Sequence, residues 1–124
     1  MGQAIAVVSG KGGTGKTSFV ANVGMALAQM GHSTLCLDCD VGLRNLDIAM
    51  AMTDRAMMDF TDVMAGNCTL EEGAAVHPRQ KNLYLLTAPA RIGAIHIDVN
   101  GFRDLFPEIC KRFDFCLVDA PAGL

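Results

Sequence analysis

The stretch from Ser9 to Ser18, SGKGGTGKTS, limits the fold of this chain more than any other part of the sequence. It follows the apolar run IAVV and precedes residues whose apolar positions recur at helical spacing. Within it, Gly10, Gly15, Lys16 and Thr17 satisfy the pattern G-x-x-x-x-G-K-[ST]. Glycines at these positions let backbone N–H groups converge on phosphate oxygens, and the following helix directs the positive end of its dipole at them. The sequence therefore predicts a phosphate-binding loop between a strand and a helix.

This loop also predicts the residues that hold a nucleotide and its metal ion. Lys16 is expected to bridge the β- and γ-phosphates, and the Thr17 hydroxyl is expected to ligate Mg²⁺. Phosphate binding within one subunit needs only Lys16 and leaves Lys11 without a task. The predicted nucleotide-binding residues are Gly10, Lys11, Gly12, Gly13, Thr14, Gly15, Lys16, Thr17 and Ser18.

Four short apolar runs, each bounded by turn residues, predict strands that are buried on both faces of a parallel sheet. A helix of about four turns connects the first two strands, ends near Gly31 and requires close packing against the sheet at Gly24. Strand, helix and strand form a βαβ unit, so we predict an α/β protein with a mostly parallel sheet. The predicted strands cover residues 4–8, 34–38, 82–88 and 113–119.

Further helices are predicted in the second half of the chain. One begins at Asp59 and is closed by Gly66, and a capping box at Thr69 opens the next. Residues 99–112 are predicted to be helical, but we expect this helix to be short, bent or shifted because Pro107 lies inside it. Core filling is favoured over an adaptable binding surface for Met50, Met52, Met57, Met58 and Met64.

Composition excludes several classes of partner. The chain has 124 residues, of which 51% are apolar, and this is enough for one core. A formal charge of −3 without a run of like charges predicts no direct binding of nucleic acid. The first apolar run is too short for a signal peptide core or a membrane span, which favours a cytoplasmic location.

The cysteines and histidines are predicted to be structural. Five cysteines in a chain without an export signal indicate free thiols. Cys36 and Cys39 form a C-x-x-C inside a predicted strand, so they are interpreted as small buried side chains and not as a metal or redox pair. The histidines, expected at the surface or hydrogen-bonded, are His32, His77 and His96.

Carboxylates follow two of the predicted strands. Asp119 ends the run FDFCLVD, and Asp38 and Asp40 stand at the end of the second strand. In an open parallel sheet ligands bind beyond the carboxyl ends of the strands, so these side chains are expected beside the loop. We predict that Asp119, Asp38 and Thr17 form the metal site, and that a carboxylate at the end of the second strand, Asp38 or Asp40, orients or deprotonates the attacking water. A solvated turn is the alternative for Asp38 and Asp40.

With these motifs the sequence resembles the MinD/ParA family of deviant Walker A P-loop ATPases. KGGTGKT, DCDVGLRNLD and DAPAG match the family's P-loop, first switch and second switch, in order and at the family's spacing. The resemblance covers nearly the whole chain and implies a three-layer P-loop NTPase fold. GLRNLD favours the septum-placing branch, whereas flagellar-number regulators and ParA-type partitioning ATPases remain alternatives.

The resemblance also implies roles for single residues. Lys11 matches the signature lysine, which reaches phosphates held by the other subunit of an ATP-sandwiched homodimer. Asp40 matches the residue that positions the hydrolytic water, and Asn45 lies in the first switch close to the active site. Asp119 matches the second-switch aspartate near the metal. The implied catalytic residues are Lys11, Lys16, Asp40 and Asn45, with ATP and Mg²⁺ as cofactors.

The implied cycle consists of ATP-driven dimerisation, attachment to the inner face of the cell membrane, recruitment of a MinC-like division inhibitor, and hydrolysis stimulated by a MinE-like activator. Family members are roughly twice as long, so residues 1–124 are expected to be the amino-terminal part of one P-loop ATPase domain whose carboxy-terminal half is absent. The run at 4–8 is then expected to be a bare apolar sheet edge. A truncated, non-catalytic nucleotide-binding module is the remaining alternative.

Overall fold

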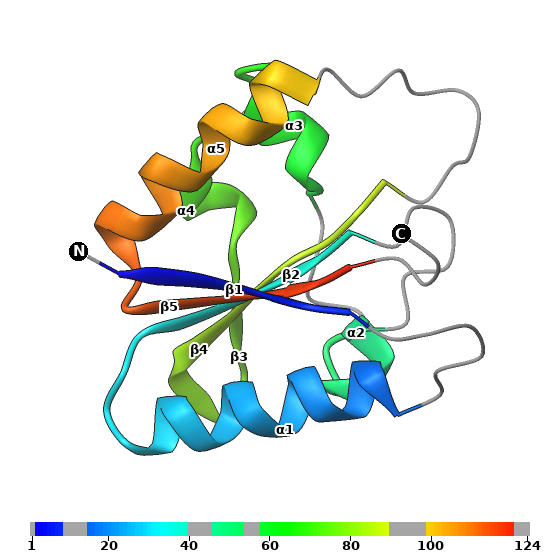
Figure 1. Ribbon diagram of the computed structural model, residues 1–124, viewed down its shortest axis with the longest axis vertical. Helices are drawn as coiled ribbons and strands as arrows, with labels where there is room; N and C mark the ends of the chain where they lie inside the picture. Colours follow the sequence, from blue (N-terminus) through cyan, green and yellow to red (C-terminus); the bar gives the residue numbers. More distant parts are fainter. Residues whose placement is uncertain (1, 9–14, 40–45, 54–57, 90–98, 121–124) are drawn as a thin grey trace.

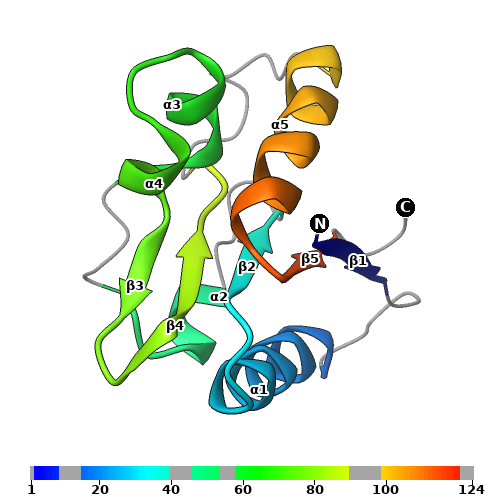
Figure 2. The ribbon, with the colours of Figure 1, turned by 90° about the vertical axis from the view of Figure 1, so that its left-hand side faces the viewer.

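The computed structural model describes residues 2–8, 15–39, 46–53, 58–89 and 99–120. These residues form a twisted sheet with helices on both faces, and Figures 1 and 2 show the three layers from two sides. Along the sheet the strands follow the order β1-β5-β2-β4-β3. Neighbouring strands are parallel except for β3 and β4, so the predicted α/β fold with a mostly parallel sheet is confirmed. The strands are β1 (Gln3–Val7), β2 (Thr34–Asp38), β3 (Ala75–His77), β4 (Gln80–Leu86) and β5 (Phe115–Asp119).

The helices cover the two faces of the sheet unequally. Two of them, α1 (Lys16–Gln29) and α2 (Leu46–Ala49), lie on one face. The other face is covered by α3 (Phe60–Met64), α4 (Leu70–Gly73) and α5 (Val99–Arg112). Each face has its own buried cluster, one that includes Val20 and Leu117 and one that includes Phe60 and Ile109.

Apolar character predicts burial better than it predicts strand pairing. The sequence predicts strands to 88 and from 113, but β4 ends at Leu86 and β5 begins at Phe115. Thr87 is fully buried yet forms only an isolated bridge with Asp59. Phe113 is buried in the core beside Tyr84, but its N–H donates to the carbonyl of Ile109 at the end of α5 and not to a neighbouring strand. β3 was not predicted, because a segment of three residues is too short to show a periodicity.

The predicted helix starts at Asp59 and Thr69 are confirmed. Both residues are N-caps of capping boxes, for α3 and α4 respectively. The prediction that residues 99–112 are helical is confirmed, because α5 spans that whole range with Pro107 inside it. The expectation that this helix is short or shifted is wrong. Pro107 and Arg103 are both exposed, so water can satisfy the Arg103 carbonyl whose intrahelical N–H partner a proline removes.

The methionines divide between core and surface. Met50 and Met52 are buried and Met64 packs against the core, as predicted. Met58 is 38% exposed and departs from the core-filling interpretation. Met57 lies outside the described residues.

Two other expectations for the sheet are confirmed. Gly24 of α1 lies so close to the sheet that a Cβ atom there would be 2.6 Å from Sγ of Cys36. β1 is at the edge of the described sheet, and Ile5 in its centre is 42% exposed. Within the described residues, no helix is both long and apolar enough to cross a membrane.

Candidate functional site

The carboxyl ends of β1, β5 and β2 come together beside the start of α1. Asp119 of β5 is in register with Val7 of β1 and with Asp38 of β2. The Cys39 N–H donates to the Asp119 carbonyl at 3.1 Å, and the Ala120 N–H donates to the Val7 carbonyl at 3.2 Å. These backbone bonds hold the three strand ends side by side.

Three side chains from α1 and β5 are in direct contact at this edge. Lys16 Nζ lies 2.6 Å from Asp119 Oδ1 and also donates to the Ala120 carbonyl. Thr17 Oγ1 donates to Asp119 Oδ2 at 3.0 Å. The Lys16 and Asp119 side chains are 7% and 2% exposed, so their ion pair is largely hidden from water. The structure thus joins the loop lysine and the loop hydroxyl to a strand-end carboxylate that lies about 100 positions later in the sequence.

The start of α1 is suited to an anion. Its N-cap is Gly15, which supplies no side-chain cap, and its first turn contains no acidic residue. The N–H groups of this turn have no intrahelical acceptors, and the helix dipole leaves them partly positive. A phosphate group can therefore satisfy donors that a Ser or Asp cap would otherwise occupy.

Asp38 is fully buried and connects the site to α2. Its Oδ2 accepts from the Leu46 N–H at 3.4 Å, which places the first turn of α2 against the end of β2. The solvated turn considered for Asp38 is therefore wrong. Its predicted role at a metal stays a prediction.

The donors at this edge fit Mg²⁺. Thr17 and Asp119 offer hydroxyl and carboxylate oxygens, which are the hard ligands that Mg²⁺ prefers. Because Thr17 donates its proton to Asp119, lone pairs of its oxygen remain for a cation. No group of three His, Cys, Asp or Glu side chains able to hold a metal occurs in the described part of the chain. An ion here would take its remaining ligands from water and phosphate, as Mg²⁺ commonly does.

Cys39 is a thiol at the same edge. Burial, with smaller contributions from Asp38 and Asp119, raises the pKa of Cys39 from 9.0 to about 12. Burial likewise raises the pKa of Cys36 to about 12, and all cysteines are free, which confirms the prediction of unpaired thiols. A protonated thiol adds no negative charge where phosphates are expected.

We predict that Cys39 resists alkylation. At pH 8 the raised pKa leaves Cys39 much less thiolate than a thiol with pKa 9 has, so iodoacetamide should react at least about tenfold more slowly. The higher nucleophilicity of the thiolate offsets only part of this loss. Peptide mapping by mass spectrometry over time measures this rate, with the same chain unfolded in urea as the control. Equal rates in the native and unfolded chains would contradict the assignment of a partly buried, protonated thiol.

The comparison with protein families agrees with this geometry. The model of the CobQ/CobB/MinD/ParA nucleotide binding domain matches residues 5–114. This chain belongs to that family. The septum site-determining protein MinD of Thermotoga maritima is 40% identical over 124 residues, which are all of this chain and 46% of the relative. MinD of Bacillus subtilis is 37% identical over all of this chain and 47% of the relative. The chain spans about half the length of the curated relatives it matches.

Solved structures of family members superpose on the fold. The MinC:MinD cell division protein complex of Aquifex aeolicus matches 98% of this chain and 48% of its own, with a TM-score of 0.86 and 37% identity. MinD of Pyrococcus horikoshii, complexed with Mg-ADP, matches 100% of this chain and 51% of its own, with a TM-score of 0.76 and 32% identity. The P-loop NTPase-like family fold is therefore confirmed, and this chain contains part of that fold.

Only some of the predicted site residues lie in the described part of this family member. Lys16, Thr17 and Asp119 are in contact, and Gly15 and Ser18 flank them at the start of α1. The acceptor that sequence reasoning missed is the Ala120 carbonyl, because a backbone atom leaves no signal in side-chain motifs. The predicted residues outside the described ones are Gly10, Lys11, Gly12, Gly13, Thr14, Asp40 and Asn45.

Proposed function

We propose that this chain supplies the nucleotide-binding part of a Mg²⁺-dependent ATPase switch that dimerises on ATP and positions the division septum. Residues 1–124 are, in this proposal, the amino-terminal part of a single P-loop ATPase domain. The observation that carries the proposal is the contact of Lys16 and Thr17 with Asp119, at the anion-suited start of α1. Relatives named as septum site-determining MinD proteins support the choice of branch.

Lys16 is the charge that binds the phosphates. Without them its ammonium group is paired with Asp119 and the Ala120 carbonyl. Phosphate oxygens compete for the same ammonium donors, so phosphate binding turns Lys16 away from Asp119. The buried Asp119 carboxylate then requires another cation, since an unpaired buried charge is costly. Bound Mg²⁺ would meet this need and neutralise charge on the β- and γ-phosphates.

Two residues outside the described part complete the proposed chemistry. Asp40 orients the hydrolytic water, with Asn45 close to it in the first switch. Asp38 is two positions from Asp40, and its bond to the Leu46 N–H brackets this segment between β2 and α2.

The proposed role of Lys11 requires a second subunit. Lys11 reaches phosphates bound in the other copy, which makes dimerisation depend on ATP. The dimer attaches to the inner face of the cell membrane through a segment outside this chain, recruits a MinC-like division inhibitor and is discharged by a MinE-like activator. The MinC:MinD complex of the Aquifex aeolicus relative supports the inhibitor as a partner.

Binding of fluorescent ATP tests the nucleotide site. The 124-residue chain should bind it weakly but saturably in the presence of Mg²⁺, and chelation of Mg²⁺ should weaken binding. ADP should compete, whereas adenosine should not, because the contacts proposed here are to phosphates. Binding that adenosine displaces as well as ADP does would contradict a phosphate-directed site.

Turnover and dimerisation are tested on this chain joined to the part of the Thermotoga maritima relative that it does not cover. The joined protein should sediment as a dimer with Mg-ATP and hydrolyse it. Lys11→Ala should abolish the ATP-dependent dimer and turnover while sparing most nucleotide binding. Asp40→Ala is the matched variant that should keep both binding and dimerisation but lose turnover. A Lys11→Ala protein that still dimerises on ATP would overturn the two-subunit proposal.

A further inference from the structure

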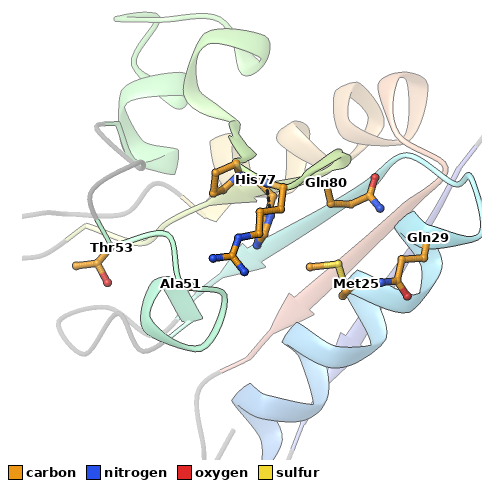
Figure 3. Close-up of a pocket in the computed structure, with 8 residues that line it drawn as sticks. Met25, Gln29, Ala51, Thr53, His77 and Gln80 are labelled. Carbon is orange, nitrogen blue, oxygen red and sulfur yellow. Dashed lines mark hydrogen bonds between the residues drawn. The ribbon is translucent and has the colours of Figure 1, made fainter.

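A hollow of about 810 Å³ lies between α1, the segment after α2 and the turn that joins β3 to β4. Figure 3 shows its lining side chains, with Met25 and Gln29 on α1, Thr53 after α2, and Gln80 at the start of β4. Met25 lies about 14 Å along the helix axis from Lys16, at 1.5 Å per residue. The hollow is therefore separate from the nucleotide site.

One buried histidine fixes two walls of the hollow relative to each other. Nε2 of His77 lies 3.1 Å from the Met50 carbonyl, and Nδ1 accepts from the Arg79 N–H at 3.0 Å. Because Nδ1 is an acceptor, the ring is neutral and carries its proton on Nε2, which donates to Met50. The prediction of a hydrogen-bonded His77 is confirmed. Because these hydrogen bonds hold the two walls together, the hollow is formed without a ligand.

The wall at Ala51 is held in a conformation that the residue does not favour. Its φ angle is 56°, in the left-handed region that non-glycine residues rarely adopt. Two backbone bonds enforce it, from the Ala51 N–H to the Ile48 carbonyl at 3.0 Å and from the Met52 N–H to the Asp47 carbonyl at 2.8 Å. This turn is therefore a fixed surface of the hollow.

The lining combines one cation with neutral polar and apolar groups. Among the described residues that line the hollow, Arg79 is the only one with a charged side chain. It is exposed and forms no ion pair with another described residue. Gln29 and Gln80 bring amides from opposite walls, and Met25 and Pro78 add apolar surface. An arginine fork binds a carboxylate with two parallel hydrogen bonds, whereas a polyphosphate would need more positive charge than one residue supplies.

We propose that this hollow binds a small organic monoanion, a carboxylate on an apolar body. Arg79 pairs with the carboxylate, Met25 and Pro78 contact the body, and the two glutamine amides bind polar substituents. The volume lies in the range of small-molecule sites, which are mostly apolar with a few placed polar groups. A ligand here touches both α1 and the turn after α2. The other end of α1 carries Lys16, and the other end of α2 contacts Asp38, so the ligand contacts two elements that also reach the nucleotide site.

The test is an NMR titration of the full 124-residue chain with acetate, hexanoate and 3-phenylpropanoate, with inorganic phosphate as a comparison. We expect saturable shifts at the side-chain amides of Gln29 and Gln80, with affinity rising along the carboxylate series. Arg79→Gln should weaken binding at least about tenfold, because it removes a charged hydrogen-bond pair. The affinity of the Arg79→Lys variant should lie between those of the parent chain and Arg79→Gln, because lysine keeps the charge but cannot form two parallel hydrogen bonds.

Lys81→Gln is the matched control. Lys81 carries the same charge as Arg79 and lies two positions later in the chain, in β4. Its side chain is exposed and does not line the hollow. This substitution should leave binding unchanged, and Mg-ATP should not displace the carboxylates, which separates this result from the nucleotide proposal. The amide spectrum checks that each variant folds. The proposal is overturned if the carboxylates give no saturable shifts, if Arg79→Gln binds as well as the parent chain, or if acetate binds as tightly as 3-phenylpropanoate.

Discussion

Lys16→Ala is expected to abolish measurable nucleotide binding. The substitution removes an ammonium group that is 7% exposed and already poised beside the start of α1. Loss of one partner from a buried, hydrogen-bonded charge pair costs about 2–5 kcal/mol, which corresponds to a loss of affinity of about 30-fold or more. Titration with fluorescent Mg-ATP measures the change.

The same substitution leaves the Asp119 carboxylate in a site that is 2% exposed, with Thr17 as its remaining side-chain partner. Breaking a buried ion pair costs roughly 3–5 kcal/mol of folding free energy, so loss of binding could reflect loss of the fold. Lys16→Ala with Asp119→Asn removes both charges and should regain most of the stability, measured by urea unfolding. It should still not bind nucleotide. Parent-like nucleotide binding by this double variant would show that Lys16 does not bind the phosphates.

Gly24→Val is expected to lower the free energy of unfolding by about 3 kcal/mol or more. A Cβ atom at position 24 would be 2.6 Å from Cys36 Sγ and 3.3 Å from Leu83 Cδ1. Both neighbours are fully buried in the central strands, so neither side chain has free space to move into. Overpacking of a core costs about 1–3 kcal/mol, and valine adds two methyl groups beyond the clashing carbon. Urea unfolding monitored by circular dichroism measures the loss.

Ala26→Val on the exposed face of the same helix is the control, and should cost less than about 1 kcal/mol, as helix propensity alone predicts. Gly24→Ala combined with Cys36→Ala tests the contact directly, because removal of Sγ makes room for the new methyl group. We expect a favourable coupling of at least about 1 kcal/mol between these two changes. Additive costs would mean that the sheet does not restrict position 24 through Cys36.

The sequence predicts the strands and α1 because each has enough residues to show a pattern. It also predicts that Thr17 and Asp119 share one edge, because parallel strands bring their carboxyl ends together. It does not predict the ion pair between Lys16 and Asp119. In the motif, Lys16 has a phosphate as its partner, and the contact with Asp119 depends on how β5 lies beside α1.

The hollow at Arg79 escapes sequence reasoning for a different reason. Its walls come from the second half of α1, the turn at Ala51 and the turn after β3, and none of these segments has a motif. His77, which joins two of these walls, looks like one of three scattered histidines until β3 and β4 are paired. Sites built from such short segments depend on tertiary distances that neither periodicity nor spacing encodes.

The strand order also determines when this protein can acquire its site. β5 comes last in the sequence among the described strands, yet it lies between β1 and β2, with Gln3 opposite Phe115. Closing so long a loop before any pairing energy is gained slows folding, and a chain still being synthesised has no middle strand to pair with. β1 and β2 must therefore wait for residues 115–119 to leave the ribosome. The same event delivers Asp119 to Lys16, so the joining of β1 to β2 through β5 and the assembly of the phosphate site are one folding step.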